Sequence, residues 1–162
     1  MIRKFSRYLT ESGQESFTVK LRIKRKSTNV KCILTPAEVS RLYEAAKDDA
    51  LGLRDKAILA LHYGCGLRKN EGANINVKDI LLDKDLVYVR KGKGYKERYV
   101  PLAGKGKADL ENYILYGRPH LAADQKNDAL LLNVSGTRLS GHMAYERLQK
   151  LKMITRIKNW QR

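Results

Sequence analysis

The stretch from Leu86 to Leu102, LVYVRKGKGYKERYVPL, limits the possible folds more than any other part of the chain. Apolar and polar residues alternate on both sides of a central KGKGYK segment, which is the pattern of two half-buried strands joined by a glycine-rich turn. Elsewhere the apolar residues mostly follow the spacing of helices. We therefore expect an α+β fold, in which a mainly helical domain carries a small antiparallel β-sheet.

Helix signals lie on both sides of this predicted hairpin. In LTPAEV, Thr35 can cap a helix, a proline occupies the first helical position and Glu38 the third, which predicts a capping box. Glycines at 64 and 66 and the Arg118-Pro119 pair are expected to end two later helices, and ALLLNV predicts a short buried strand. Apolar spacing places the further helices at residues 1–12, 53–65, near 68, 110–117 and from 140 onward.

The composition changes before residue 34. Residues 17–33 hold six basic side chains and no acidic one, so this segment is either a solvated linker or an arm that lies along a phosphate backbone. We expect three parts: residues 1–13 as the end of a preceding domain, 14–33 as a basic linker and 34–162 as the main domain. The arm would contact DNA through Lys20, Arg22, Lys24, Arg25 and Lys26.

Charge and cysteine content narrow the function further. Lys and Arg number 33 against 17 Asp and Glu, a net charge of +16, which favours a polyanionic partner such as nucleic acid. Cys32 and Cys65 lie far apart without zinc-ligand spacing, and no apolar run is long enough to cross a bilayer. We expect a cytoplasmic protein with no metal site, no disulfide and no membrane segment.

The glycine-rich stretches do not match nucleotide-binding templates. A dinucleotide fingerprint would need glycine at Lys69 or at Glu97, and AGKGKA lacks both the first glycine and the final Ser or Thr of a P-loop. We therefore expect no nucleotide and no other cofactor.

The stretch YGCGLRKNEG places Arg68 three residues before Glu71, so both side chains share a helix face and the carboxylate can orient the guanidinium. An arginine held in this way is a suitable bidentate receptor for a phosphate. An ordinary surface ion pair would have the same sequence, and the pair alone does not separate the two interpretations.

Three segments together resemble the catalytic domain of tyrosine recombinases, the phage-integrase and Xer-type family: LTPAEVSRLYEAA, RDKAILALHYGCGLRKNEGANINVKDI and LVYVRKGKGYKERYVPL. The resemblance covers about residues 34–152, and FSRYL with the basic segment after it resembles the end of the family's core-binding domain and its linker. It implies double-stranded DNA as substrate, a covalent 3′-phosphotyrosine intermediate without metal or nucleotide, and a tetramer on DNA for a full-length enzyme.

The same resemblance implies roles for individual residues. Arg68 matches the first catalytic arginine, which grips the scissile phosphate, and Glu71 matches a supporting acidic position. Lys93 matches the hairpin lysine that protonates the departing 5′ oxygen, while Lys91 and Lys96 would contact the DNA backbone. The chain departs from the family pattern at Asn70, where serine is common, and at Gly72, where an apolar residue is common.

The family's nucleophilic tyrosine and its His-x-x-Arg box have no match in these residues. His142 is followed by Met, Ala and Tyr145, and we interpret that tyrosine as a packing residue. We expect a catalytic domain truncated before the second half of its active site, which binds DNA but does not cut it alone. A non-catalytic DNA-binding protein and a regulatory partner of a full-length recombinase remain the alternatives.

Overall fold

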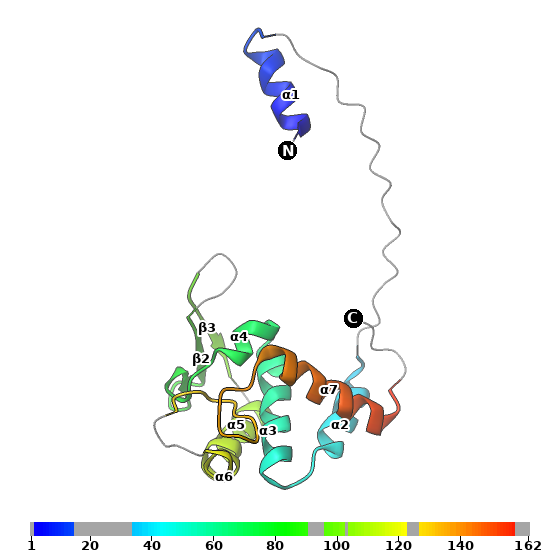
Figure 1. Ribbon diagram of the computed structural model, residues 1–162, viewed down its shortest axis with the longest axis vertical. Coiled ribbons are helices and arrows are strands. Elements are labelled where there is room, and N and C mark those ends of the chain that lie inside the picture. Colours follow the sequence, from blue (N-terminus) through cyan, green and yellow to red (C-terminus); the bar gives the residue numbers. More distant parts are fainter. Residues whose placement is uncertain (1, 15–33, 91–95, 103, 123–126, 158–162) are drawn as a thin grey trace. The chain divides into compact units, whose positions relative to one another are not determined.

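The computed structural model describes residues 2–14, 34–90, 96–102, 104–122 and 127–157 (Figure 1). Residues 1–32 and 33–160 form two compact units. In the described part of the first unit, helix α1 (Ile2–Glu11) is followed by Gly13, whose φ of 71° belongs to the left-handed region that favours glycine. The helix predicted for residues 1–12 is therefore confirmed.

The second unit combines helices with one small sheet. Strands β1 (Ile80–Leu81), β2 (Leu86–Val89) and β3 (Arg98–Pro101) form an antiparallel sheet in the order β1-β2-β3, with Leu86 paired to Pro101. The helices are α2 (Pro36–Ala45), α3 (Ala50–Leu59), α4 (Lys69–Ala73), α5 (Lys105–Asn112), α6 (Arg118–Leu121) and α7 (Gly141–Thr155). Both the hairpin and the α+β class predicted from the sequence are confirmed.

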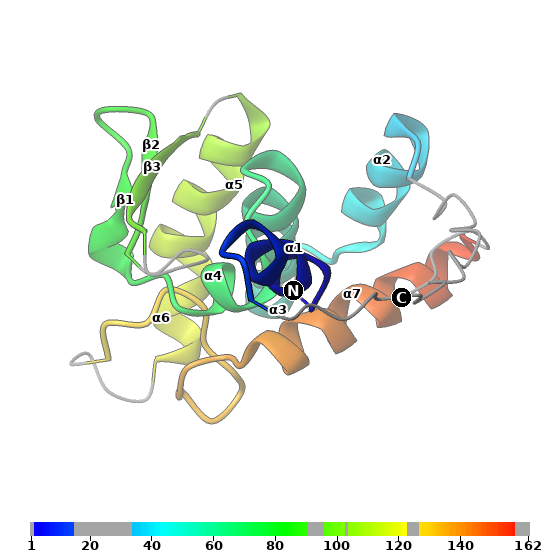
Figure 2. The same cartoon turned by 90° about the horizontal axis from the view of Figure 1, so that it is seen from above.

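Helix α3 lies at the centre of the second unit, between α5 on the sheet side and α7 (Figure 2). The largest fully buried side chains come from α2, α3, the segment after α3, β2, Leu102, α5, Tyr113 and the 130–139 region, and all of them except Leu132 belong to one cluster. Their burial is what stabilises this arrangement, at about 25 cal/mol for each Å² of apolar surface. Among the described residues, no helix has the length and apolarity needed to span a bilayer.

The helix caps predicted at Thr35 and Ser140 are confirmed. The hydroxyl of Thr35 accepts a hydrogen bond from the Glu38 N–H at 3.3 Å, and the Glu38 carboxylate accepts one from the Thr35 N–H at 2.8 Å, so the capping box is present. The hydroxyl of Ser140 accepts from the Met143 N–H at 3.2 Å and caps α7. These caps fix where α2 and α7 begin.

Two helices continue as π-helical turns that the sequence does not signal. Residues Ala60–Gly64 extend α3, and Tyr113–Gly117 extend α5 directly into α6. The stop predicted at Arg118-Pro119 is wrong, because the π-turn starts a new hydrogen-bond ladder in which Pro119 falls in the first turn of α6. A proline is tolerated there, since the first N–H groups of a helix need no helical partner.

The strand predicted for ALLLNV is also wrong, although its burial is right. Residues 129–132 are fully buried but form only isolated bridges, to Asn76 and to Arg138. Two separate segments and several side chains satisfy the backbone here: the Leu130 N–H donates to the Ile75 carbonyl at 3.0 Å, and the Leu131 carbonyl accepts from the Leu139 N–H at 2.9 Å. The Arg118 side chain donates to the Ala129 carbonyl at 3.0 Å, and the Arg54 side chain donates to the Leu132 carbonyl at 3.0 Å.

Candidate functional site

Backbone conformation brings Arg68 to the start of α4. The π-turn after α3 ends at Gly64, and Gly66 reverses the chain with a φ of 62°. Arg68 then adopts an extended conformation immediately before α4. Its side chain is 63% exposed, so the guanidinium is accessible to a large ligand.

Glu71 is the buried centre of the site, with a side chain only 5% exposed. Its carboxylate accepts hydrogen bonds from the Arg68 N–H at 2.9 Å and from Arg68 Nη1 at 3.1 Å. It also accepts two from Arg98, whose Nη1 and Nη2 lie 3.2 and 2.8 Å away. The hydrogen bonds from Arg98, followed by those from Arg68, lower the pKa of Glu71 to about 2, so the carboxylate is ionised at neutral pH.

Arg98 is a site residue that the sequence analysis missed. It lies in β3, 27 residues after Glu71, within the KERYVPL segment. The only signal is its place in a strand next to the basic tip. Which helix end meets that strand depends on how the sheet packs, and a single sequence does not reveal it.

An open groove beside this cluster is lined by Gly66, Arg68, Lys96, Glu97 and Arg98. Three of these five residues are cationic, and one carboxylate oxygen of Glu97 accepts a hydrogen bond from the Tyr88 hydroxyl at 2.6 Å. The structure thus brings the predicted residues Arg68, Glu71 and Lys96 together. The other predicted site residues lie outside the described ranges: Lys20, Arg22, Lys24, Arg25, Lys26, Lys91 and Lys93.

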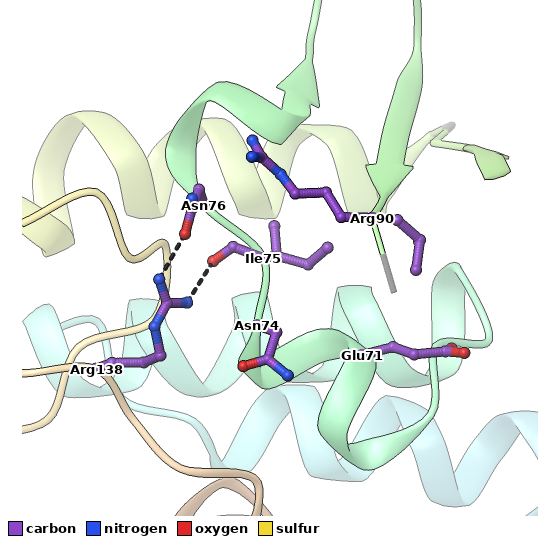
Figure 3. Close-up of a pocket in the computed structure, with 7 residues that line it drawn as sticks. Glu71, Asn74, Ile75, Asn76, Arg90 and Arg138 are labelled. Atoms are coloured by element: carbon purple, nitrogen blue, oxygen red, sulfur yellow. Dashed lines mark hydrogen bonds between the residues drawn. The ribbon is translucent and has the colours of Figure 1, made fainter. Parts of the chain in front are cut away.

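A second hollow, of about 290 Å³, is lined by residues from Glu71 to Asn76, by Val89 and Arg90 of the hairpin, and by Arg138 (Figure 3). Arg138 donates from Nη1 to the carbonyls of Ala73 and Ile75, at 3.0 and 3.1 Å, and from Nη2 to the Asn76 side chain at 2.5 Å. In Figure 3 the Glu71 carboxylate points away from this group. The chain leaving α4 is therefore fixed by Arg138, while Glu71 is held on the opposite side by Arg98.

Close packing around α4 explains the glycine at position 72, whereas the structure gives no reason for asparagine at position 70. A side chain at Gly72 would place its Cβ 2.6 Å from the His62 ring. That ring is itself held, because its Nδ1 lies 2.9 Å from the carbonyl of Leu67. On the other face, the Asn70 side chain and Lys69 lie so close to Gly141 that a Cβ there would be 3.0 Å from each. Small residues at 72 and 141 thus allow α4 to sit between His62 and α7.

We expect Gly72→Ala to destabilise the domain by about 1–2 kcal/mol, because the imidazole must move and alanine's better helix propensity offsets only part of that cost. Urea unfolding measures the change. Gly64→Ala is the matched control, since a Cβ added at Gly64 would meet nothing within 4 Å, and it should cost less than about 0.5 kcal/mol. Equal stability for both variants would show that the His62 contact is not restrictive.

Acid should weaken the domain through Glu71. Its pKa falls from an ordinary 4.5 to about 2 on folding, so its stabilising effect is complete above about pH 4.5 and is lost as the pH falls toward 2. After allowance for solvent screening the loss is on the order of 2 kcal/mol. We expect Glu71→Gln to show a shallower fall in unfolding free energy across this window than the wild-type protein. Parallel curves would contradict the ion-pair geometry.

The chemistry available to this cluster is the binding and charge stabilisation of an anion. Arg68 uses one side-chain donor on Glu71, and a guanidinium has five, so the remaining N–H groups can serve a phosphate in the groove. Within the described ranges, no three His, Cys, Asp or Glu residues are placed to hold a metal ion.

The comparisons with known proteins all identify the same family. The model of the phage integrase family matches residues 33–160. A tyrosine recombinase XerC of Natranaerobius thermophilus is 34% identical over 155 residues, covering 92% of this chain and 52% of that protein. A XerD of Oceanobacillus iheyensis is 38% identical over 142 residues, covering 86% and 48%. The chain therefore spans about half the length of these curated relatives.

Solved structures show the same fold. The XerA recombinase aligns with a TM-score of 0.69 at 22% identity, over 98% of this chain and 54% of that one. A lambda integrase tetramer bound to a Holliday junction aligns with a TM-score of 0.62 at 16% identity, over 96% and 43%. At these identities the likeness establishes the fold.

Proposed function

Because the chain belongs to the phage integrase family, we propose that it takes part in site-specific recombination of double-stranded DNA. The strongest support for this proposal is the geometry around Arg68. An exposed arginine, Arg68, is held by a buried carboxylate at the edge of a basic groove, which suits the single negative charge of a phosphodiester and the further charge that develops on it in the transition state.

Each site residue has a separate task in this proposal. Arg68 binds the non-bridging oxygens of the scissile phosphate and stabilises the charge that grows when a tyrosine oxygen attacks the phosphorus. Glu71 keeps the guanidinium in place. As the bond from phosphorus to the 5′ oxygen breaks, Lys93 gives its proton to that oxygen, while Lys91 and Lys96 neutralise neighbouring phosphates.

The attacking tyrosine and the second arginine are assigned to a segment outside the family motifs present here. No histidine of the chain is followed by arginine at the third position, so the His-x-x-Arg box is not among these residues. We therefore assign DNA binding to this chain by itself, and cleavage to its combination with a segment that carries the box and the tyrosine. Tetramer formation on DNA belongs to that complete assembly.

The part before the main domain has its own proposed role. Residues 14–33 act as a basic arm that follows the DNA backbone, between the end of a preceding domain at 1–13 and the catalytic part at 34–162. Its six basic residues and absence of acidic ones after residue 16 support this assignment over that of an inert linker.

Salt titration tests DNA binding directly. If at least three phosphates are neutralised, the affinity for a duplex should fall roughly tenfold or more between about 50 and 200 mM salt, because bound counterions are released. A variant with glutamine at the five basic positions of the arm, from Lys20 to Lys26, should bind more weakly and show a smaller salt slope. A dissociation constant that does not change with salt would refute the proposal.

A further inference from the structure

We propose that Arg98 is a positioning residue, which aims Arg68 at the phosphate by fixing the carboxylate of Glu71. The inference rests on the proposed function, since it takes the Arg68 guanidinium as the phosphate-binding group. It adds a dependence of that group on the β-hairpin, because Arg98 belongs to β3.

The hydrogen bonds to Glu71 support this role, because each carboxylate oxygen accepts one bond from Arg98 and one from Arg68. Oxygen Oε1 accepts from Arg98 Nη1 and from Arg68 Nη1, while Oε2 accepts from Arg98 Nη2 and from the backbone N–H of Arg68. Arg98 thus forms a two-pronged contact that fixes the plane of the carboxylate. Once that plane is fixed, the single side-chain bond from Arg68 has one preferred direction.

The Arg68–Glu71 contact alone would fix little. Arg68 is 63% exposed and contributes one side-chain hydrogen bond, so that pair alone would resemble the surface ion pairs that are worth about 0–1 kcal/mol. Arg98 changes the situation because it reaches the same carboxylate from a different element and leaves it 5% exposed. Two fixed supports, α4 and β3, then determine where the guanidinium of Arg68 lies.

This geometry also links the hairpin to the arginine. Strand β3 pairs with β2 from Val89–Arg98 to Leu86–Pro101, and the segment that carries Lys93 joins these two strands in the sequence. The bond from Arg98 to Glu71 begins at the first residue of β3. A displacement of the hairpin base would therefore be transmitted to Arg68, so both parts of the site respond together.

The substitution Arg98→Lys separates the positioning role of Arg98 from the effect of its positive charge. It keeps the positive charge in the groove but offers a single nitrogen in place of the planar fork. Arg98→Lys should therefore leave general attraction to DNA intact and loosen the carboxylate. A role of Arg98 as one more surface charge would make the lysine variant equivalent to the wild-type protein.

A double-mutant cycle on the full 162-residue chain tests the inference, with the dissociation constant for a duplex at fixed salt as the readout. We expect Arg68→Ala to weaken binding about fivefold in the wild-type background and less than about twofold in the Arg98→Lys background. Lys96→Gln is the matched control, because Lys96 lines the same groove and makes no contact with Glu71 among the hydrogen bonds of the described residues. Its effect and that of Arg68→Ala should add.

Each outcome has a distinct meaning. A full fivefold effect of Arg68→Ala in the Arg98→Lys background would overturn the positioning role while leaving the proposed function intact. No effect of Arg68→Ala in the wild-type background would refute the phosphate role of Arg68 and the inference with it. If Arg98→Lys fails to fold in a thermal melt, the same cycle with Glu71→Gln decides, and a retained Arg68 effect there overturns the inference.

Discussion

Arg68→Ala is expected to reduce DNA strand cleavage at least about 10³-fold in a protein that joins this chain to a segment with a His-x-x-Arg box and a tyrosine. The size follows from the loss of a preorganised charge that faces the phosphate in the transition state. Stability should change by less than about 1 kcal/mol, because the side chain is 63% exposed. Trapping of the covalent protein–DNA complex on a nicked duplex, followed on a denaturing gel, measures the effect.

The control for this experiment is Arg41→Ala. Arg41 is an exposed arginine of α2, so its loss changes the net charge by the same amount without touching the groove. Cleavage by that variant should stay within about threefold of the wild-type rate, given the weak effect of a single distant charge. If Arg68→Ala also stayed within tenfold, Arg68 would not be the residue that stabilises the transition state.

Asp55→Ala should cause the largest loss of stability, about 3–5 kcal/mol. Asp55 is 1% exposed, and its carboxylate accepts hydrogen bonds from Arg147 at 3.1 and 2.5 Å. It also lies 3.9 Å from the guanidinium of Arg54, which is itself buried. Removal of the carboxylate leaves Arg54 as a buried charge without its counterion, and that cost exceeds the value of the pair itself.

The matched comparison is Asp48→Ala. Asp48 also pairs with a basic residue, Lys56, at 2.6 Å, but its side chain is 93% exposed. Its loss should shift the unfolding midpoint far less than the loss of Asp55, because water and salt screen so exposed a pair. Denaturant unfolding of both variants would show the contrast, and similar midpoints would mean that the Arg54–Asp55–Arg147 cluster between α3 and α7 is not what holds these helices together.

The parts of the fold that the sequence predicts correctly depend on near neighbours in the chain. Thr35 and Glu38 are three residues apart, the paired strands β2 and β3 are close together in the sequence, and Gly66 adopts the left-handed conformation after the helix that precedes it. Caps and turns of this kind need only local contacts to form. For the same reason, the glycines before Arg68 are enough to predict that it lies at a helix start.

The features that the sequence analysis predicted wrongly or missed are those that tertiary contacts determine. Residues 129–132 have the apolar run of a buried strand, but their backbone partners are divided between two separate segments, at Ile75 and Leu139, and the side chains of Arg54 and Arg118. Arg98 meets Glu71 only because the sheet packs beside α4. The π-turns before Arg68 and before Arg118 have no composition that separates them from an α-helix.

The π-turn at Ala60–Gly64 makes the length of the chain before Arg68 a functional property. A π-turn holds one more residue than the α-helical turn it replaces, so deletion of a single residue there converts it to a regular α-turn and leaves the later residues facing as before. Deletion of a second residue exceeds this allowance and rotates every later residue of the helix by about 100° around its axis. Arg68 would then leave the direction of the groove. We therefore expect the segment Ala60–Gly64 to accept the loss of one residue, and the site to be lost with the loss of two.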